Sequence, residues 1–183
     1  MGSTHEVEPL VTRRPWAALG LVAGPAAFIG GWLVGGRRTP GYSPVHDAIS
    51  RIAAVGAPER DLMTTAFVAY GASVIVAPAA LRSSPLRRCW PIAAVNGAAT
   101  IAVAALPLEH SAAMDTWHGV AAGTGYVSIA ALQLASARPL RETGHERAAA
   151  LALAGGLATG AALVATTISD ANGFSQRLRL TIR

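Results

Sequence analysis

Hydrophobic and polar positions divide this chain into five long apolar stretches separated by short polar segments. None of the five contains Asp, Glu, Lys or Arg. Each has about the 20 residues that a helix needs to cross a bilayer. No polar stripe recurs at helical spacing, which is typical of helices surrounded by lipid or protein. The stretches cover residues 16–36, 62–81, 89–108, 116–137 and 148–169. We therefore predict an all-α fold, a polytopic transmembrane helical bundle with five spans.

Composition agrees with a membrane protein and disfavours two other classes. Of the 183 residues, 52% are hydrophobic and 14% are charged, whereas soluble domains carry about 25% charged residues. A soluble helical bundle would need a charged outer face on each helix, and these stretches have none. The 15 basic residues are all arginines, scattered among short loops, whereas nucleic-acid binding requires a clustered basic face. The single Cys89 permits no intrachain disulfide.

The positions of the arginines predict the orientation of the bundle. Residues 82–88 and 138–147 hold three arginines each, whereas residues 109–115 between them hold none. Because cytoplasmic loops carry an excess of Lys and Arg, we expect both basic loops and the N-terminal tail, 1–15, to face the cytoplasm of a bacterial inner membrane. Residues 170–183 would then be an outer tail, which could begin a sixth span that the chain lacks. The arginines of the first outer loop oppose this assignment: Arg37, Arg38, Arg51 and Arg60.

Small and polar residues inside the spans predict how the helices associate. Glycines four residues apart allow close approach of helix backbones. The chain has four such pairs, Gly20/Gly24, Gly31/Gly35, Gly119/Gly123 and Gly156/Gly160. They predict a tight bundle, and the same faces could support a homo-oligomer. Interhelical hydrogen bonds are expected from three polar residues, which could instead line a solute path: Asn96, Gln133 and Thr124.

The segment GYSPVHDAISRIAAVGAPERD, between the first two stretches, combines helix signals with polar residues. Ser43 suits an N-cap, Pro44 the first helical position and Gly56 the C-terminal stop. Asp47 and Arg51 are four residues apart with the acid first, the order that favours a helical ion pair. Apolar residues recur at helical spacing, at Val45, Ile49 and Ile52. We predict a short amphipathic interfacial helix in this first outer loop.

The same segment carries a resemblance to a known family. The run Tyr-Ser-Pro-x-His-Asp-x-Ile-Ser-Arg at 42–51, followed by Gly-Ala-Pro at 56–58, resembles the bacterial integral membrane family catalogued as domain of unknown function 998. The resemblance extends from Trp16 to about Arg177. It implies six spans, one more than this chain has, and no activity. Shorter matches lie at the end of the third span and the start of the fourth, at Pro107 and His118-Gly119.

Titratable side chains outside the basic loops fall on one predicted face of the membrane, where we expect a polar cap. Its members are Asp47, Ser50, Arg51, Glu109, His110, Asp115, His118 and Asp170. Imidazoles and carboxylates there could bind zinc in a hydrolase site. The candidate catalytic residues are His46, Asp47, Ser50 and His118. No strong metal motif such as HExxH occurs. We therefore favour a structural role, in which Asp47, Ser50 and His118 fasten the interfacial helix to the helix ends.

Three functions are open at this point. The leading hypothesis is a non-enzymatic accessory, interaction or lipid-contacting protein, with no cofactor and with the lipid bilayer as its partner. The alternative is a membrane-embedded, metal-dependent hydrolase that acts on a lipid-like substrate. The third is a small permease for uncharged solutes. Proton-coupled transport is disfavoured, because it requires charged residues inside the membrane and the spans have none.

Overall fold

The computed structural model describes residues 15–76 and 84–181, and side chains within 19–76 and 84–165. Within these ranges the chain is helical and contains no strand, which confirms the predicted all-α class. The N-terminal tail and the end of the second predicted span lie outside the described residues. The elements, of which η1 and η2 are short 3-10 helices, are α1 (Pro15–Arg38), η1 (Ile49–Ala53), α2 (Arg60–Val76), η2 (Pro85–Cys89), α4 (Trp90–Ala105), α5 (Ala112–Glu142) and α6 (Glu146–Thr181).

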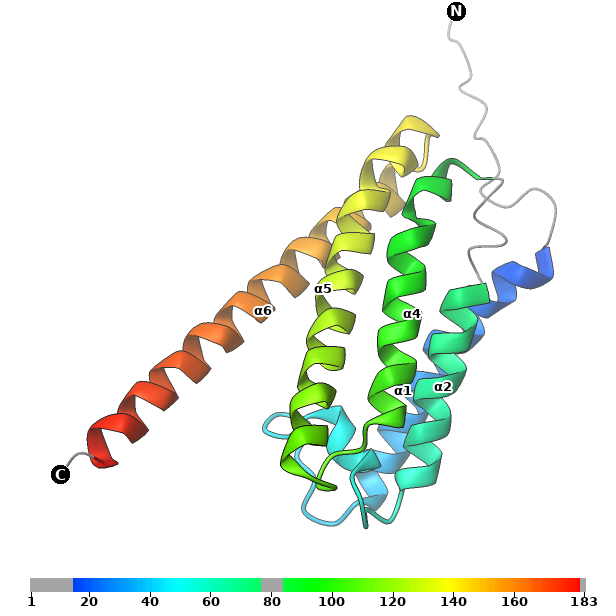
Figure 1. Ribbon diagram of the computed structural model, residues 1–183. Helices are drawn as coiled ribbons and strands as arrows, with labels where there is room; N and C mark the ends of the chain where they lie inside the picture. The colour runs from blue at the N-terminus through cyan, green and yellow to red at the C-terminus, as the bar shows by residue number, and fades with distance from the viewer. Residues whose placement is uncertain (1–14, 77–83, 182–183) are drawn as a thin grey trace, which may run out of the picture.

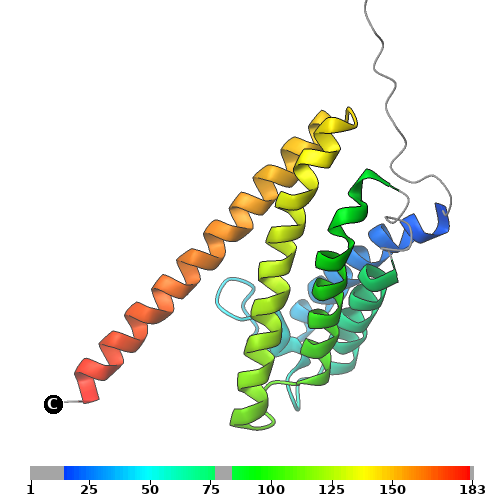
Figure 2. The ribbon, with the colours of Figure 1, turned by 45° about the horizontal axis from the view of Figure 1, so that its top comes forward.

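The five long helices form an antiparallel series in which each packs on the next (Figure 1). Accordingly α1 packs on α2, α2 on α4, α4 on α5, and α5 on α6. The α1–α2 and α4–α5 connections lie at one end of the bundle, and the α5–α6 turn lies at the other. Helix α6 continues unbroken to Thr181, past the predicted end of the fifth span at Ser169. Its C-terminal half diverges from α5, as Figures 1 and 2 both show.

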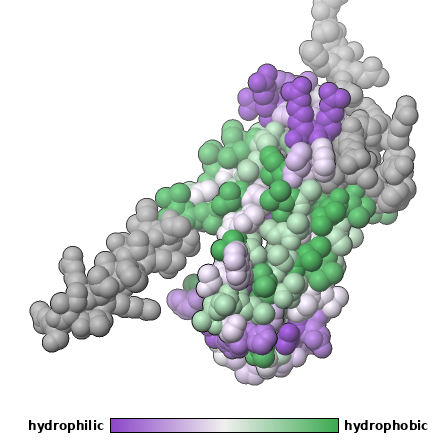
Figure 3. Space-filling view, viewed as in Figure 1, coloured by the Kyte–Doolittle hydropathy of each residue, from purple (hydrophilic) through white to green (hydrophobic). Residues whose placement is uncertain are grey.

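Among the described residues, three helices are long and apolar enough to cross a membrane, within Leu19–Arg38, Ala112–Glu142 and Glu146–Ala165. The other two are shorter, with 17 residues in the described part of α2 and 16 in α4. At 1.5 Å per residue, α4 covers about 24 Å, less than the roughly 30 Å of a hydrocarbon core. The 3-10 helix η2 directly precedes α4 and extends it. Figure 3 shows hydrophobic surface between two hydrophilic ends, as expected of a helical membrane bundle.

Close backbone contacts occur at some of the predicted glycines and at a pair that the spacing did not indicate. A Cβ on Gly24 or Gly31 of α1 would clash with side chains of α2. The closest crossing is between α2 and α4, where a Cβ on Gly71 would lie 2.6 Å from the carbonyl oxygen of Gly97, and the reverse also holds. The predicted Gly119/Gly123 contact is wrong, because a Cβ on either residue would meet no atom within 4 Å. Gly119 is exposed and Gly123 is half-buried.

The amphipathic helix predicted from 43 to 56 is wrong in its extent. Ser43 does begin a helical turn, since its carbonyl accepts from the N–H groups of His46 and Asp47 at 3.2 and 2.8 Å. Ala48 then adopts extended backbone, with ψ at 143°, and the chain becomes helical again only in η1. Within the first turn the Asp47 carboxylate accepts from the Ser43 N–H at 2.8 Å, a contact of the kind that caps the start of a helix.

The 3-10 helix η1 inserts into the end of the bundle. Ile52 is completely buried, at 0% exposure, in a core that includes Met63, whereas Val45 is 82% exposed. These residues therefore do not share one apolar face, contrary to the prediction from helical spacing. The Val55 N–H donates to the carbonyl of Leu108 at 3.0 Å. The segment is thus fastened to the α4–α5 connection.

Candidate functional site

Part of the predicted polar cap does assemble at the end of the bundle that holds the α1–α2 and α4–α5 connections. The Arg51 guanidinium lies 3.7 Å from the Asp47 carboxylate, so the predicted ion pair is present. Arg51 also lies 3.4 Å from the carboxylate of Glu109, a contact that joins the two connections. The Arg51 side chain is 56% exposed, and exposed pairs contribute about 0.2–1 kcal/mol each. These ion pairs join the α1–α2 and α4–α5 connections. Their contribution to the free energy of unfolding is small.

Glu109 and Asp115 also shape the backbone between α4 and α5. Glu109 has a φ of 66°, a left-handed conformation that is uncommon for a residue other than glycine. Its N–H donates to the Asp115 carboxylate at 2.9 Å, which fixes that turn. Ser111 caps α5 by accepting from the Met114 N–H at 3.3 Å. Asp115 therefore has a geometric role in this connection.

The candidate catalytic residue His46 and the cap residues His110 and Asp170 are not shown to join this cluster. His46 and His110 are both exposed at the surface. Asp170 belongs to α6, and its side chain lies outside the described residues. Among the described residues, no group of three or more His, Cys, Asp or Glu side chains could hold a metal ion. The zinc hydrolase alternative therefore gains no ligand set from this part of the chain.

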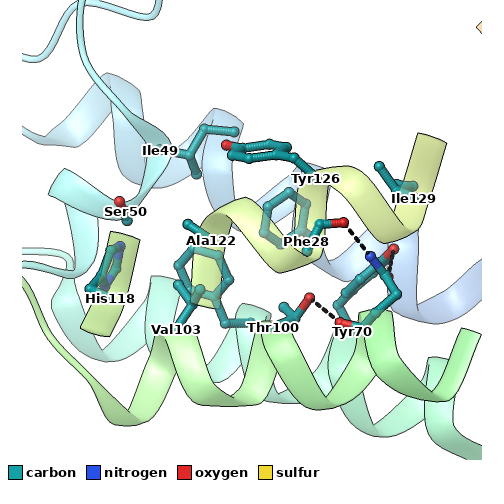
Figure 4. A pocket seen from close by; sticks show the side chains of 13 residues that line it. Phe28, Ile49, Ser50, Tyr70, Thr100, Val103, His118, Ala122, Tyr126 and Ile129 are labelled. Carbon is teal, nitrogen blue, oxygen red and sulfur yellow. Dashed lines mark hydrogen bonds between the residues drawn. The ribbon is translucent and has the colours of Figure 1, made fainter. Parts of the chain in front are cut away.

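Next to the polar cap lies a cavity of about 130 Å³ (Figure 4). Its lining comes from η1 and from four of the long helices, so it forms only when the bundle is assembled. Most of the lining is apolar or aromatic, with a few polar groups, which is typical of sites for small molecules. The residues are Phe28, Ile49, Ser50, Phe67, Tyr70, Asn96, Thr100, Val103, His118, Ala122, Gly125, Tyr126 and Ile129.

His118 is the titratable side chain of this lining that is most buried, with 5% of its surface exposed. Its Nδ1 lies 2.6 Å from the carbonyl oxygen of Leu106. A carbonyl can only accept, so we assign the proton of the neutral imidazole to Nδ1. The other nitrogen, Nε2, is then an acceptor, and it is buried without a partner among the described residues. Figure 4 shows His118 and Ser50 next to each other at one end of the cavity.

Asn96 closes the opposite part of the cavity and makes the interhelical hydrogen bonds predicted for it. It is only 2% exposed. Its Oδ1 accepts from the hydroxyl of Tyr70 on α2 at 2.8 Å. Its Nδ2 donates to the carbonyl of Gly125 at 2.9 Å and to the hydroxyl of Ser128 at 3.2 Å, both on α5. One side chain of α4 therefore connects three helices.

The other two residues of that prediction behave differently. The hydroxyl of Thr124 donates to the Val120 carbonyl of its own helix at 2.8 Å, so it makes no interhelical bond. Ser and Thr side chains commonly satisfy themselves in this way within a helix. Gln133 does lie between α5 and α6, where a Cβ on Gly155 would come within 3.1 Å of it. Its Oε1 is buried without a partner among the described residues.

Sequence reasoning missed the aromatic side chains of the cavity. The Phe28 ring packs against Phe67 at a centroid distance of 5.3 Å and against Tyr70 at 5.5 Å. Tyr126 lines the same cavity from α5. These residues come from three helices, and only Phe67 and Tyr70, three residues apart on α2, are related by helical spacing. The presence of aromatic residues within charge-free spans was the one feature of the sequence that could have indicated this lining.

Comparison with known proteins places the chain in a family. The chain belongs to the family described as protein of unknown function (DUF998), whose model matches residues 22–182. This confirms the resemblance that the segment around Asp47 indicates. No curated protein and no solved structure matches the chain. The family description supplies no activity, so function has to be argued from the site.

Proposed function

We propose that this member of the DUF998 family is a multi-pass protein of the bacterial inner membrane that binds a lipid-like molecule without transforming it. The observation that carries the proposal is the largely apolar cavity of about 130 Å³ among α1, α2, α4 and α5. In a membrane bundle such a cavity is surrounded by lipid, so the molecules available to fill it are those dissolved in the bilayer. The bilayer is thus both solvent and source of ligand.

Contact with lipid is supported by large apolar side chains exposed on the outer faces of the helices. In water these side chains would form a continuous hydrophobic surface, which monomeric soluble proteins avoid. The most exposed of them belong to α1, α5 and α6. They are Leu19, Val22, Trp117, Val127, Leu151 and Leu157.

The proposed orientation of the bundle in the membrane is argued from the arginines at its two ends. The end with η2 and the α5–α6 turn carries five arginines in the described residues: Arg87, Arg88, Arg138, Arg141 and Arg147. In its two connections the opposite end carries four, of which Arg38 lies 3.9 Å from Glu59 and Arg51 contacts two acids, and α6 brings Arg177 and Arg179 to the same end. The support for placing the first end in the cytoplasm is therefore the contrast among the short connections, since the one between α4 and α5 holds no arginine. The polar cap would then face outward.

Entry to the cavity is proposed to lie between α1 and α5. Both helices line it, through Phe28 and Tyr126, yet they do not form one of the packed helix pairs. Tyr126 is 50% exposed while it also lines the cavity. An apolar chain could therefore pass this tyrosine laterally, without crossing the polar cap.

Photocrosslinking with a single-chain probe tests this proposal. A fatty acyl chain bearing a terminal diazirine is added to the protein in lipid vesicles, and labelled peptides are identified by mass spectrometry. We expect labelling at the cavity, and at least a several-fold loss in Ala122→Phe, because the larger side chain fills the space. Ala135→Phe is the matched control, since Ala135 lies on the exposed face of the same helix. Equal labelling of both variants, or none at the cavity in the unmodified protein, would contradict the proposal.

A further inference from the structure

The residues that line the cavity on α5 follow one another from the polar cap toward the middle of the bundle. His118 lies two turns into α5, and Ile129 lies at the other end of the cavity (Figure 4). The 11 intervening steps correspond to about 16 Å along the helix axis. Half of the hydrocarbon core is about 15 Å thick. The cavity therefore extends over about the depth of one leaflet, with the imidazole at the interfacial end.

The polar groups of the cavity differ in whether they already have hydrogen-bond partners. Asn96 is fully engaged by Tyr70, Gly125 and Ser128. The Thr100 hydroxyl donates to the Asn96 carbonyl at 2.9 Å. His118 Nε2, by contrast, has a lone pair and no partner among the described residues. Burying an acceptor without a donor costs roughly 1–3 kcal/mol. The absence of a donor for His118 Nε2 is therefore the feature of this cavity that calls for an explanation.

We propose that the cavity holds a single-chain amphiphile whose terminal hydroxyl donates a hydrogen bond to His118 Nε2. This rests on the proposed function and specifies its ligand class. In the assigned tautomer Nε2 can only accept a hydrogen bond. The ligand must therefore present a donor at this position, and any donor of suitable size would meet that requirement. The Ser50 hydroxyl, at the same end of the cavity (Figure 4), is placed to donate to the oxygen of that ligand.

The shape of the cavity sets the rest of the ligand. A cavity of about 130 Å³ encloses at most part of one chain and leaves no room for a second. The walls beyond the imidazole are aromatic and aliphatic, from Phe28, Phe67 and Ile129. The hydroxyl would lie near the interface and the chain would point to the bilayer centre. This is the orientation that an alcohol already has in a leaflet.

Competition between two matched probes tests the assignment. 1-Dodecanol and its methyl ether share the chain and the oxygen, but only the alcohol can donate. Each is titrated into the protein in lipid vesicles against the diazirine probe, and displacement is measured. We expect about tenfold preference for the alcohol, the size of one hydrogen bond to a buried acceptor. His118→Asn is expected to remove this preference, because asparagine can still donate to the Leu106 carbonyl but leaves no acceptor at the position of Nε2.

The outcomes separate the two proposals. Equal displacement by alcohol and ether in the unmodified protein would refute the hydroxyl contact and leave amphiphile binding intact. Displacement by neither would overturn both. A tenfold preference that persists in His118→Asn would refute the role of His118. Ser50→Ala serves as a second variant that leaves the Leu106 contact untouched, and we expect it to weaken alcohol binding and ether binding alike, since both ligands offer an acceptor oxygen.

Discussion

Replacement of Asn96 by alanine tests how α2, α4 and α5 are held together. The side chain is 2% exposed and makes three hydrogen bonds, one to α2 and two to α5. Alanine removes all three and leaves the Tyr70 hydroxyl without this acceptor. The Gly125 carbonyl keeps a donor, since the Ser128 hydroxyl also donates to it at 2.9 Å. The perturbation therefore falls mainly on the contact between α2 and α4.

The size of the effect follows from the environment. In membrane bundles an interhelical side-chain hydrogen bond contributes about 0.6 kcal/mol on average and up to about 1.7 kcal/mol. Three bonds of average strength amount to about 2 kcal/mol of unfolding free energy. The variant should remain folded, because the apolar spans still partition into lipid. It should nevertheless unfold at a lower denaturant concentration than the unmodified protein.

Equilibrium unfolding in lipid-containing micelles, followed by far-ultraviolet circular dichroism, measures this loss. Val95→Ala is the matched control, because Val95 neighbours Asn96 on α4 but is exposed. A double-mutant cycle with Tyr70→Phe should give a coupling of about 0.6–1.7 kcal/mol. If Asn96→Ala costs no more than the control, or the coupling is zero, the reasoning about this three-helix connection is refuted.

Two other predictions concern packing and topology. Gly71→Ala should destabilise the bundle by more than 1 kcal/mol, roughly the cost of overpacking, because its Cβ would lie 2.6 Å from the Gly97 carbonyl oxygen. Gly119→Ala, with no atom within 4 Å, should be neutral in the same unfolding assay. For topology, reporter fusions after Arg88 should be active in the cytoplasm and fusions after Ala113 outside. The reverse pattern would invert the proposed orientation.

The polar segment around Asp47 illustrates where sequence reasoning was correct and where it failed. The ion pair between Asp47 and Arg51 forms as the four-residue spacing predicts. The helix expected around it does not, because the chain extends at Ala48. An (i, i+4) pair requires only local proximity. It does not require an unbroken helix.

Sequence alone determined the all-helical class and its two polar ends. Both follow from the length of apolar runs and the positions of charges, which are properties of neighbouring residues. Asn96 could be predicted as an interhelical donor for a similar reason, since a buried amide within an apolar span must find a partner. Its partners, Tyr70 on one helix and Ser128 on another, could not be predicted.

The tertiary structure alone decided the cavity and the close contact between Gly71 and Gly97. Ser50 and His118 are far apart in the sequence, and they line one space only because η1 inserts beside α5. Which nitrogen of His118 accepts depends on the Leu106 carbonyl at the end of α4. Burial and partner geometry come from helix packing, and packing in lipid depends on contacts among helices that no local pattern records.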